Sequence, residues 1–173
     1  MIIPRSKSRS AFTLIEILVV VVILGITSAI ILPQLGTRDD LKTSSTAREI
    51  AADLLYVQNR SISMGKYHYV VFSTSSGKYD VMDSVSPQNI ITHPVLHTPY
   101  EVLFGTGALQ GCTLTTANFD GSAILAFDEM GVPYSYTAGT GATPLNAGSI
   151  VITSGAATIT VTIQPYSGEI KVQ

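Results

Sequence analysis

One carboxylate interrupts a long apolar segment near the start of the chain. Glu16 lies in the stretch from Ala11 to Leu32, where the other polar residues are Thr13, Thr27 and Ser28. A carboxylate at the centre of a bilayer costs roughly 2.5 to 3.5 kcal/mol even on lenient insertion scales. The chemistry expected of Glu16 is therefore electrostatic, because its charge requires a compensating cation or a special location.

The histidines and serines suggest no catalytic or metal site. His93 and His97 have the i, i+4 spacing of a helical metal pair, but Pro94 lies between them, so surface histidines are the favoured interpretation. Ser154 and Ser167 each precede a glycine without the GxSxG context of a nucleophile elbow. We therefore expect no nucleophile and no metal ligand among these residues.

The glycine-rich and acidic segments are equally uninformative about chemistry. The GxGxxxG spacing in residues 105–111 lacks the strand-to-helix context of a nucleotide site, which favours a loop. Asp80 with Asp83, or Asp128 with Glu129, could contact calcium, but solvated carboxylates are the default interpretation. We expect a protein that is not an enzyme and that has no cofactor.

The apolar segment is long enough to cross a bilayer as a helix, since about 20 apolar residues suffice. Arg5, Lys7 and Arg9 precede it, and no acid occurs among the first eleven residues. Because positive flanks stay on the cytoplasmic side, we expect a single pass with the remainder of the chain exported.

Length and charge limit the exported part to one modest domain. The chain has 173 residues, and its formal charge is −2. Without the first eleven residues, seven cations face twelve acids, which leaves a charge near −5 and argues against binding to phosphate backbones. Cys112 is the only cysteine, so no intrachain disulfide can form, and a buried apolar role is favoured.

Helical periodicity continues beyond the apolar segment. Spacings of three and four residues connect a set of mainly apolar positions, Ala47, Ile50, Ala51, Leu54, Leu55, Val57, Gln58 and Ile62. This pattern predicts an amphipathic helix from about Ser44 to Ser63, with Ser45 near its start and Gly65 as its stop. Pro33 and Gly36 predict a kink between the two halves of one long helix.

Short β segments follow. Strands are expected at residues 67–73, 79–83, 101–104, 123–127, 149–153, 158–164 and 169–172, with loops at 84–99 and 134–148. The stretch from Thr158 to Ile163 alternates apolar residues with threonine, the pattern of a half-buried strand. The predicted fold class is α+β, in which the long helix covers one face of an antiparallel sheet.

The segment Ala11-Phe12-Thr13-Leu14-Ile15-Glu16, with its basic leader and apolar helix, resembles the processing site of type IV pilins and type II secretion pseudopilins. The resemblance implies that a prepilin peptidase cuts between Ala11 and Phe12 and methylates the new amine of Phe12. Ala11 stands where the family usually has glycine. Glu16 takes the place of the family glutamate, which acts in assembly.

The C-terminal third resembles H-type minor pseudopilins and FimT-like minor pilins in residues 126–133, 150–152, 159–163 and 168–172. The implied organisation is a leader (1–11), a transmembrane and assembly helix (12–35), an amphipathic helix (36–65) and a β-rich domain (66–173). The implied partners are prepilin peptidase, other pilin or pseudopilin subunits and an inner-membrane assembly platform. The implied location is the inner membrane, with the N-terminus cytoplasmic and the domain periplasmic, followed by a periplasmic or extracellular fibre.

This resemblance gives the charge of Glu16 a partner. The helix dipole favours a carboxylate in the first turn by only about 0.3 to 1 kcal/mol at exposed sites, which is less than the insertion cost. A charge-assisted pair with the freed amine of a neighbouring subunit offsets more of it. Since an unpaired Glu16 is unfavourable, we expect this pair to fix the axial offset between subunits.

Three alternatives remain open. A secretory signal peptide could end at Thr27-Ser28-Ala29, and the mature chain would then begin at Ile30. An uncleaved anchor would begin at Met1. A tip-located minor pilin could bind DNA or a secreted substrate, but Lys171 is the only cation from Gly111 onward, so nucleic acid is an unfavoured partner.

Overall fold

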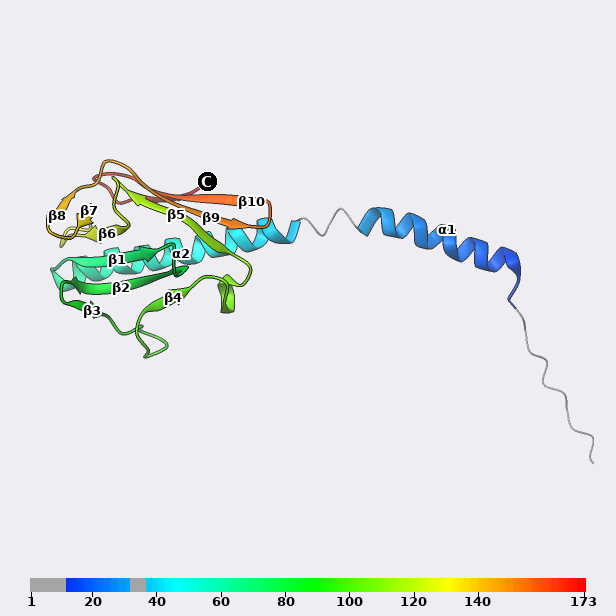
Figure 1. The fold of residues 1–173 in the computed structure, drawn as a ribbon, viewed down its shortest axis with the longest axis horizontal. Helices are drawn as coiled ribbons and strands as arrows, with labels where there is room; N and C mark the ends of the chain where they lie inside the picture. The colour runs from blue at the N-terminus through cyan, green and yellow to red at the C-terminus, as the bar shows by residue number, and fades with distance from the viewer. Residues whose placement is uncertain (1–11, 32–36) are drawn as a thin grey trace, which may run out of the picture. The chain divides into compact units, whose positions relative to one another are not determined.

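A computed structural model describes residues 12–31 and 37–173 of the chain. The chain divides into two compact units, residues 1–38 and residues 39–173. The expected leader (1–11), the cleavage residue Ala11 and the predicted kink at Pro33 and Gly36 lie outside the described residues. Figure 1 shows the second unit as a helix combined with antiparallel strands.

Helix α2 spans Thr37–Met64, so the predicted start near Ser44 was wrong by two turns. Its first turn carries Asp39 and Asp40, which are favoured there by the helix dipole. Thr43 donates its hydroxyl proton to the carbonyls of both residues, at 2.9 and 3.0 Å. These polar turns lack an apolar repeat, which is why the periodicity indicated only the later part of the helix. The helix ends directly before Gly65, as predicted.

The strands form two antiparallel sheets, whereas the sequence interpretation had a single sheet. The seven-stranded sheet has the order β3-β2-β1-β6-β7-β8, with β4 also paired to β2, and the four-stranded sheet has the order β11-β10-β9-β5. The strand bounds are β1 His68–Ser73, β2 Lys78–Val85, β3 Gln88–Ile90, β4 Glu101–Leu103, β5 Thr113–Phe119, β6 Ile124–Phe127, β7 Pro133–Thr137, β8 Gly141–Pro144, β9 Gly148–Ser154, β10 Ala157–Ile163 and β11 Ile170–Val172. A short 3-10 helix, η2, spans Gly107–Leu109.

One hydrophobic core joins α2 to both sheets. From α2, the core takes Ala47, Ile50, Leu54 and Val57, each at most 1% exposed. The large sheet contributes side chains such as those of Val81 and Phe127, and the small sheet contributes those of Ile152 and Val161. Figure 1 shows α2 running alongside both groups of strands. The amphipathic helix therefore serves as the shared core element of both sheets.

The sequence interpretation missed four strands, β3, β5, β7 and β8, because none of them shows a regular alternation of buried apolar and exposed polar residues. In β5, a register shift between Leu114 and Thr116 puts Leu114 and Phe119 on one buried side despite their odd spacing. In β7, the buried positions are Pro133 and Ser135, which is not an apolar pair. Strands β3 and β8 are short edges of the large sheet, and both lie in segments expected to be loops.

Gln58 connects α2 to two turns that lie far apart in the sequence. Its side-chain amide donates to the Gly131 carbonyl at 2.8 Å and makes a longer contact of 3.5 Å with the Ser167 carbonyl. A Cβ atom at Gly168 would lie 2.4 Å from Gln58 Nε2 and 2.9 Å from Gly131 O. Gly168 therefore permits the close approach of the turn to the helix, and its φ of +65° also favours glycine.

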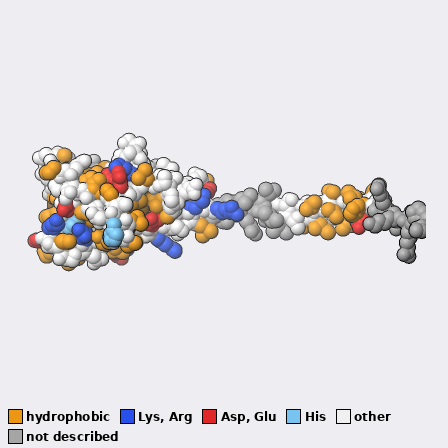
Figure 2. Space-filling view, turned by 90° about the horizontal axis from the view of Figure 1, so that it is seen from below, with side chains coloured by type: hydrophobic (Ala, Val, Ile, Leu, Met, Phe, Trp, Pro, Cys, Tyr) orange, Lys and Arg blue, Asp and Glu red, His pale blue; other side chains and the backbone are white. Residues whose placement is uncertain are grey.

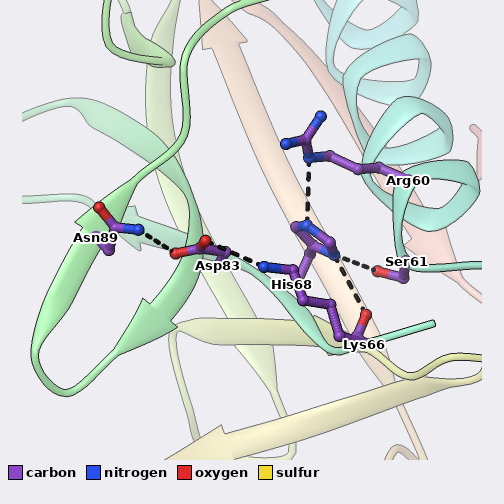
Figure 3. Close-up of polar contacts among 6 residues, drawn as sticks. All are labelled: Arg60, Ser61, Lys66, His68, Asp83 and Asn89. Atoms are coloured by element: carbon purple, nitrogen blue, oxygen red, sulfur yellow. Dashed lines mark hydrogen bonds and ion pairs between the residues drawn. The ribbon is translucent and has the colours of Figure 1, made fainter. Parts of the chain in front are cut away.

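His68 lies at the junction between α2 and β1, where Figure 3 shows its polar contacts. Its side chain is fully buried. Arg60 donates through Nε to His68 Nε2 at 3.2 Å, so Nε2 carries no proton. The other ring nitrogen, Nδ1, lies 3.3 Å from both Ser61 Oγ and the Lys66 carbonyl. Nearby, Lys66 forms an ion pair with Asp83 at 3.2 Å. Burial lowers the pKa of His68, and the adjacent positive charges add to this effect.

Substitution of Gly168 by alanine is expected to lower the free energy of unfolding by about 1–3 kcal/mol, because the new methyl group would overlap Gln58 and the Gly131 carbonyl. Denaturant unfolding of the full chain measures the loss. Gly139→Ala is the matched control, since Gly139 also has a positive φ, but a Cβ atom added there would meet no atom within 4 Å. Equal losses in the two variants would contradict the steric explanation.

The free energy of unfolding is expected to fall as the pH drops below about 6.5, the usual pKa of histidine in an unfolded chain. In this range the unfolded chain takes up a proton at residue 68 that the folded chain resists, because the folded pKa is lowered. Thermal unfolding at pH values of about 7.5 and about 5.5, on either side of that pKa, tests this for the native chain and for His68→Gln. The loss on acidification should shrink in His68→Gln and should persist in the control His97→Gln, whose side chain is exposed.

Candidate functional site

Helix α1, Leu14–Ile31, exposes its apolar side chains all around its axis. Exposure of its large apolar residues from Leu14 to Ile26 ranges from 46% at Val19 to 84% at Leu14. Phe12, the residue before Thr13, is 77% exposed. Contiguous apolar surface of this extent marks a site of protein or membrane interaction. Within the described residues, no helix combines the length and hydropathy needed to cross a membrane.

The hydroxyl groups of α1 are satisfied within the helix. Thr27 donates to the carbonyls of Ile23 and Leu24, at 2.9 and 3.1 Å, and Ser28 donates to the Leu24 carbonyl at 2.7 Å. Such bonds remove the cost of placing these hydroxyls among apolar groups. Glu16 is thus the one polar interruption of α1 with an ionisable side chain.

Glu16 lies in the first turn of α1, three residues after Thr13. Its Oε2 atom accepts a long hydrogen bond of 3.4 Å from the Thr13 N–H, which is half of a capping box. The backbone N–H groups of Glu16 and Ile17 donate to the Thr13 carbonyl. This arrangement orients the carboxylate toward the start of the helix, where Phe12 lies. Among the described residues, this long bond to a neutral donor is the one hydrogen bond of the Glu16 side chain, and it offsets little of a carboxylate charge.

The other residues considered from the sequence remain apart from this motif. His93 and His97 occupy one turn, in which His93 Nδ1 accepts the N–H groups of Val95 and Leu96 at 3.1 and 3.2 Å. The His93 ring packs against Tyr100, with centroids 4.3 Å apart. Among the described residues, no group of three or more His, Cys, Asp or Glu side chains is arranged to hold a metal ion.

The single cysteine and the acidic pairs have structural surroundings. Cys112 is buried, and its Sγ accepts a hydrogen bond of 3.2 Å from Thr46 on α2. Asp128 accepts the N–H groups of Met130 and Val132, at 2.9 and 2.8 Å, and so shapes the turn after β6. Asp80 forms an ion pair with Lys78 at 3.1 Å.

The sequence interpretation missed a groove beside α2. Glu49 and Asp53 line it from α2, and Glu101 lines it from β4. Asp53 accepts hydrogen bonds from the hydroxyls of Tyr79, at 2.5 Å, and Tyr100, at 2.9 Å. The one sequence signal was the pair of acids four residues apart on one helical face, an arrangement that is unfavourable unless something compensates it.

The electrostatics of the groove are governed by burial and by Asp53. Burial, followed by the charge of Asp53, raises the pKa of Glu49. The same two causes, in the same order, raise the pKa of Tyr79 and Tyr100 well above the usual range. Both tyrosines therefore stay protonated and act as hydrogen-bond donors that fix Asp53 in place.

Comparison with known proteins gives one family match and two similar structures. Residues 6–32 match the prokaryotic N-terminal methylation motif. Among curated proteins, none matches the chain significantly. The fold is similar to that of the minor pseudopilin EpsH from the type 2 secretion system of Vibrio cholerae, with a TM-score of 0.52 and 14% identity. That similarity covers 76% of this chain and 96% of the other.

The second structure is the type IV minor pilin FimU of Pseudomonas aeruginosa, with a TM-score of 0.45 and 13% identity, covering 75% of this chain and 91% of that one. At 14% identity, the similarity to EpsH shows the fold alone. The methylation motif is an independent observation, and its residues include Phe12 and Glu16. The chain therefore combines an N-terminal methylation motif with a fold similar to that of a minor pseudopilin.

Proposed function

We propose that this protein is a minor subunit of a type II secretion pseudopilus or a type IV pilus, with a structural and not an enzymatic role. The observation that carries the proposal is the methylation motif at residues 6–32, which is followed by a helix with exposed apolar side chains and by a domain with a minor pseudopilin fold. The helix supplies the surface for packing between subunits, and the domain is displayed by the fibre.

In this proposal, residues 1–11 form a leader that prepilin peptidase removes by cutting between Ala11 and Phe12, and the amine of Phe12 is then methylated. Residues 12–35 anchor the protein in the inner membrane by a single pass until assembly, and residues 36–65 support the β-rich domain of residues 66–173. The N-terminus faces the cytoplasm and the domain faces the periplasm. Other pilin-like subunits and an inner-membrane assembly platform are the partners.

Glu16 acts as the assembly residue of this proposal. Its Oε2 atom reaches the Thr13 N–H, so the carboxylate is held at the end of the helix where cleavage would create an ammonium group. In an assembled fibre, the amine of a neighbouring subunit compensates the charge of Glu16 in apolar surroundings. A subunit at the wrong axial offset would bury an unpaired charge, at a cost of several kcal/mol.

The mature protein is expected to begin with N-methylated Phe12. N-terminal sequencing and intact mass measurement of protein isolated from membranes or fibres test this. Loss of residues 1–11 together with one added methyl group is the expected result. A chain that starts at Met1 or at Ile30 would contradict the proposed processing.

Glu16→Ala is expected to reduce incorporation into fibres at least about tenfold while membrane insertion persists, because removal of the charge removes the pair that selects the axial offset. The amount of protein in sheared fibres, relative to the amount in membranes, measures the effect. Thr27→Ala is the control, since this hydroxyl bonds only carbonyls of its own helix and carries no charge. Normal incorporation of Glu16→Ala would remove the proposed role.

A further inference from the structure

Apolar and polar side chains line the groove beside α2 in about equal measure. It encloses about 210 Å³ between α2, the turn at residues 93–99, β4 and η2. Leu96, Pro99, Val102 and Leu109 contribute apolar wall, and Leu96 itself is 66% exposed at the rim. Figure 2 shows one face of the domain, on which hydrophobic side chains lie among acidic, basic and histidine side chains. The volume is below the roughly 300–1,000 Å³ typical of sites for drug-sized ligands, so it suits a single side chain.

The groove carries an excess of negative charge. Glu49 and Asp53 face it from α2, and Glu101 faces it from β4. Lys78 is the adjacent cation, but it forms ion pairs with both Asp80 and Glu101, so two carboxylates share one ammonium group. Asp80 Oδ1 is buried and has no hydrogen-bond partner among the described residues. The negative charge is therefore only partly compensated from within the domain.

Glu49 and Asp53 differ in how they are held. Asp53 is fixed by the hydroxyls of Tyr79 and Tyr100, so its carboxylate is positioned before any partner arrives. Glu49 makes no ion pair or side-chain hydrogen bond with a described residue, and burial together with Asp53 raises its pKa. A cation placed beside Glu49 would remove the repulsion between these two acids.

We propose that this groove receives one lysine or arginine side chain from a neighbouring pilin-like subunit in the fibre. The aliphatic stem of such a side chain matches the apolar wall at Leu96 and Leu109, and its charged head matches Glu49 and Asp53. The inference rests on the proposed function, because that function supplies the neighbouring subunit. It assigns the kind of side chain that the neighbour presents.

Binding of a model side chain to the full-length protein in detergent micelles tests the proposal. The probe is N-acetyl-arginine amide, and the matched neutral probe is N-acetyl-citrulline amide. Isotope-edited amide NMR titrations should show saturable shifts at Glu49, Leu96 and Thr106 with the arginine probe, and affinity for the citrulline probe should be about tenfold lower. Glu49→Gln should weaken arginine binding about tenfold, whereas Glu169→Gln, which removes an exposed acid on the other sheet, should leave it unchanged.

Three outcomes would overturn the proposal: no saturable shift with the arginine probe, equal binding of both probes, or shifts of the same amides by calcium chloride alone. The titration uses the isolated chain, so its failure leaves fibre assembly untouched. Failure of the proposed function would instead be seen in the N-terminal sequence and in the incorporation of Glu16→Ala. The two failures are therefore distinguishable.

Discussion

The folded domain depends on one row of side chains on α2 that is shared by two sheets. Ala47, Ile50, Leu54 and Val57 are at most 1% exposed, and they join the core residues of both sheets in a single cluster. Neither sheet could shield its inner face from water by itself, because a single antiparallel sheet needs a second layer to cover its apolar side. Three further features lie along this helix: the turns that Gln58 contacts, the junction at His68 and the groove lined by Glu49. The position of α2 therefore determines each of these features.

Much of this fold could be predicted from local patterns. The strand β10 alternates apolar residues with threonine, and the helix stop at Gly65 coincides with the end of the apolar repeat, so both were predicted. The four missed strands show where such patterns fail. A bulge in β5 changes the parity of its buried positions, and Ser135 in β7 is buried because its hydroxyl donates to the Phe119 carbonyl at 2.6 Å. Those contacts join distant segments, so a single stretch of sequence does not contain them.

The two candidate sites also differ in whether a single stretch of sequence contains their contacts. The N-terminal motif is linear, since Phe12, Thr13 and Glu16 lie close together in the chain, and its chemistry follows from residue order. The groove brings α2 together with residues much later in the chain, and its two tyrosine donors come from strand β2 and from the residue before β4. Its electrostatic character exists only after folding, because burial raises the pKa of Glu49 and folding places the hydroxyls of Tyr79 and Tyr100 against Asp53. The pair of acids on one face of α2 is the sequence pattern that could have indicated the groove.

The Gln58 amide also has a mechanical consequence. It bonds the turn after β6 at 2.8 Å and approaches the turn before β11, so α2 is fastened to each sheet at a point near its C-terminal end. Tension applied along α2 is consequently shared by both sheets. To separate α2 from the sheets, such tension must slide the whole row of packed side chains past the strands in shear, which breaks many contacts together. Peeling the helix away would instead break these contacts one after another. A domain built in this way resists a steady pull on its helix.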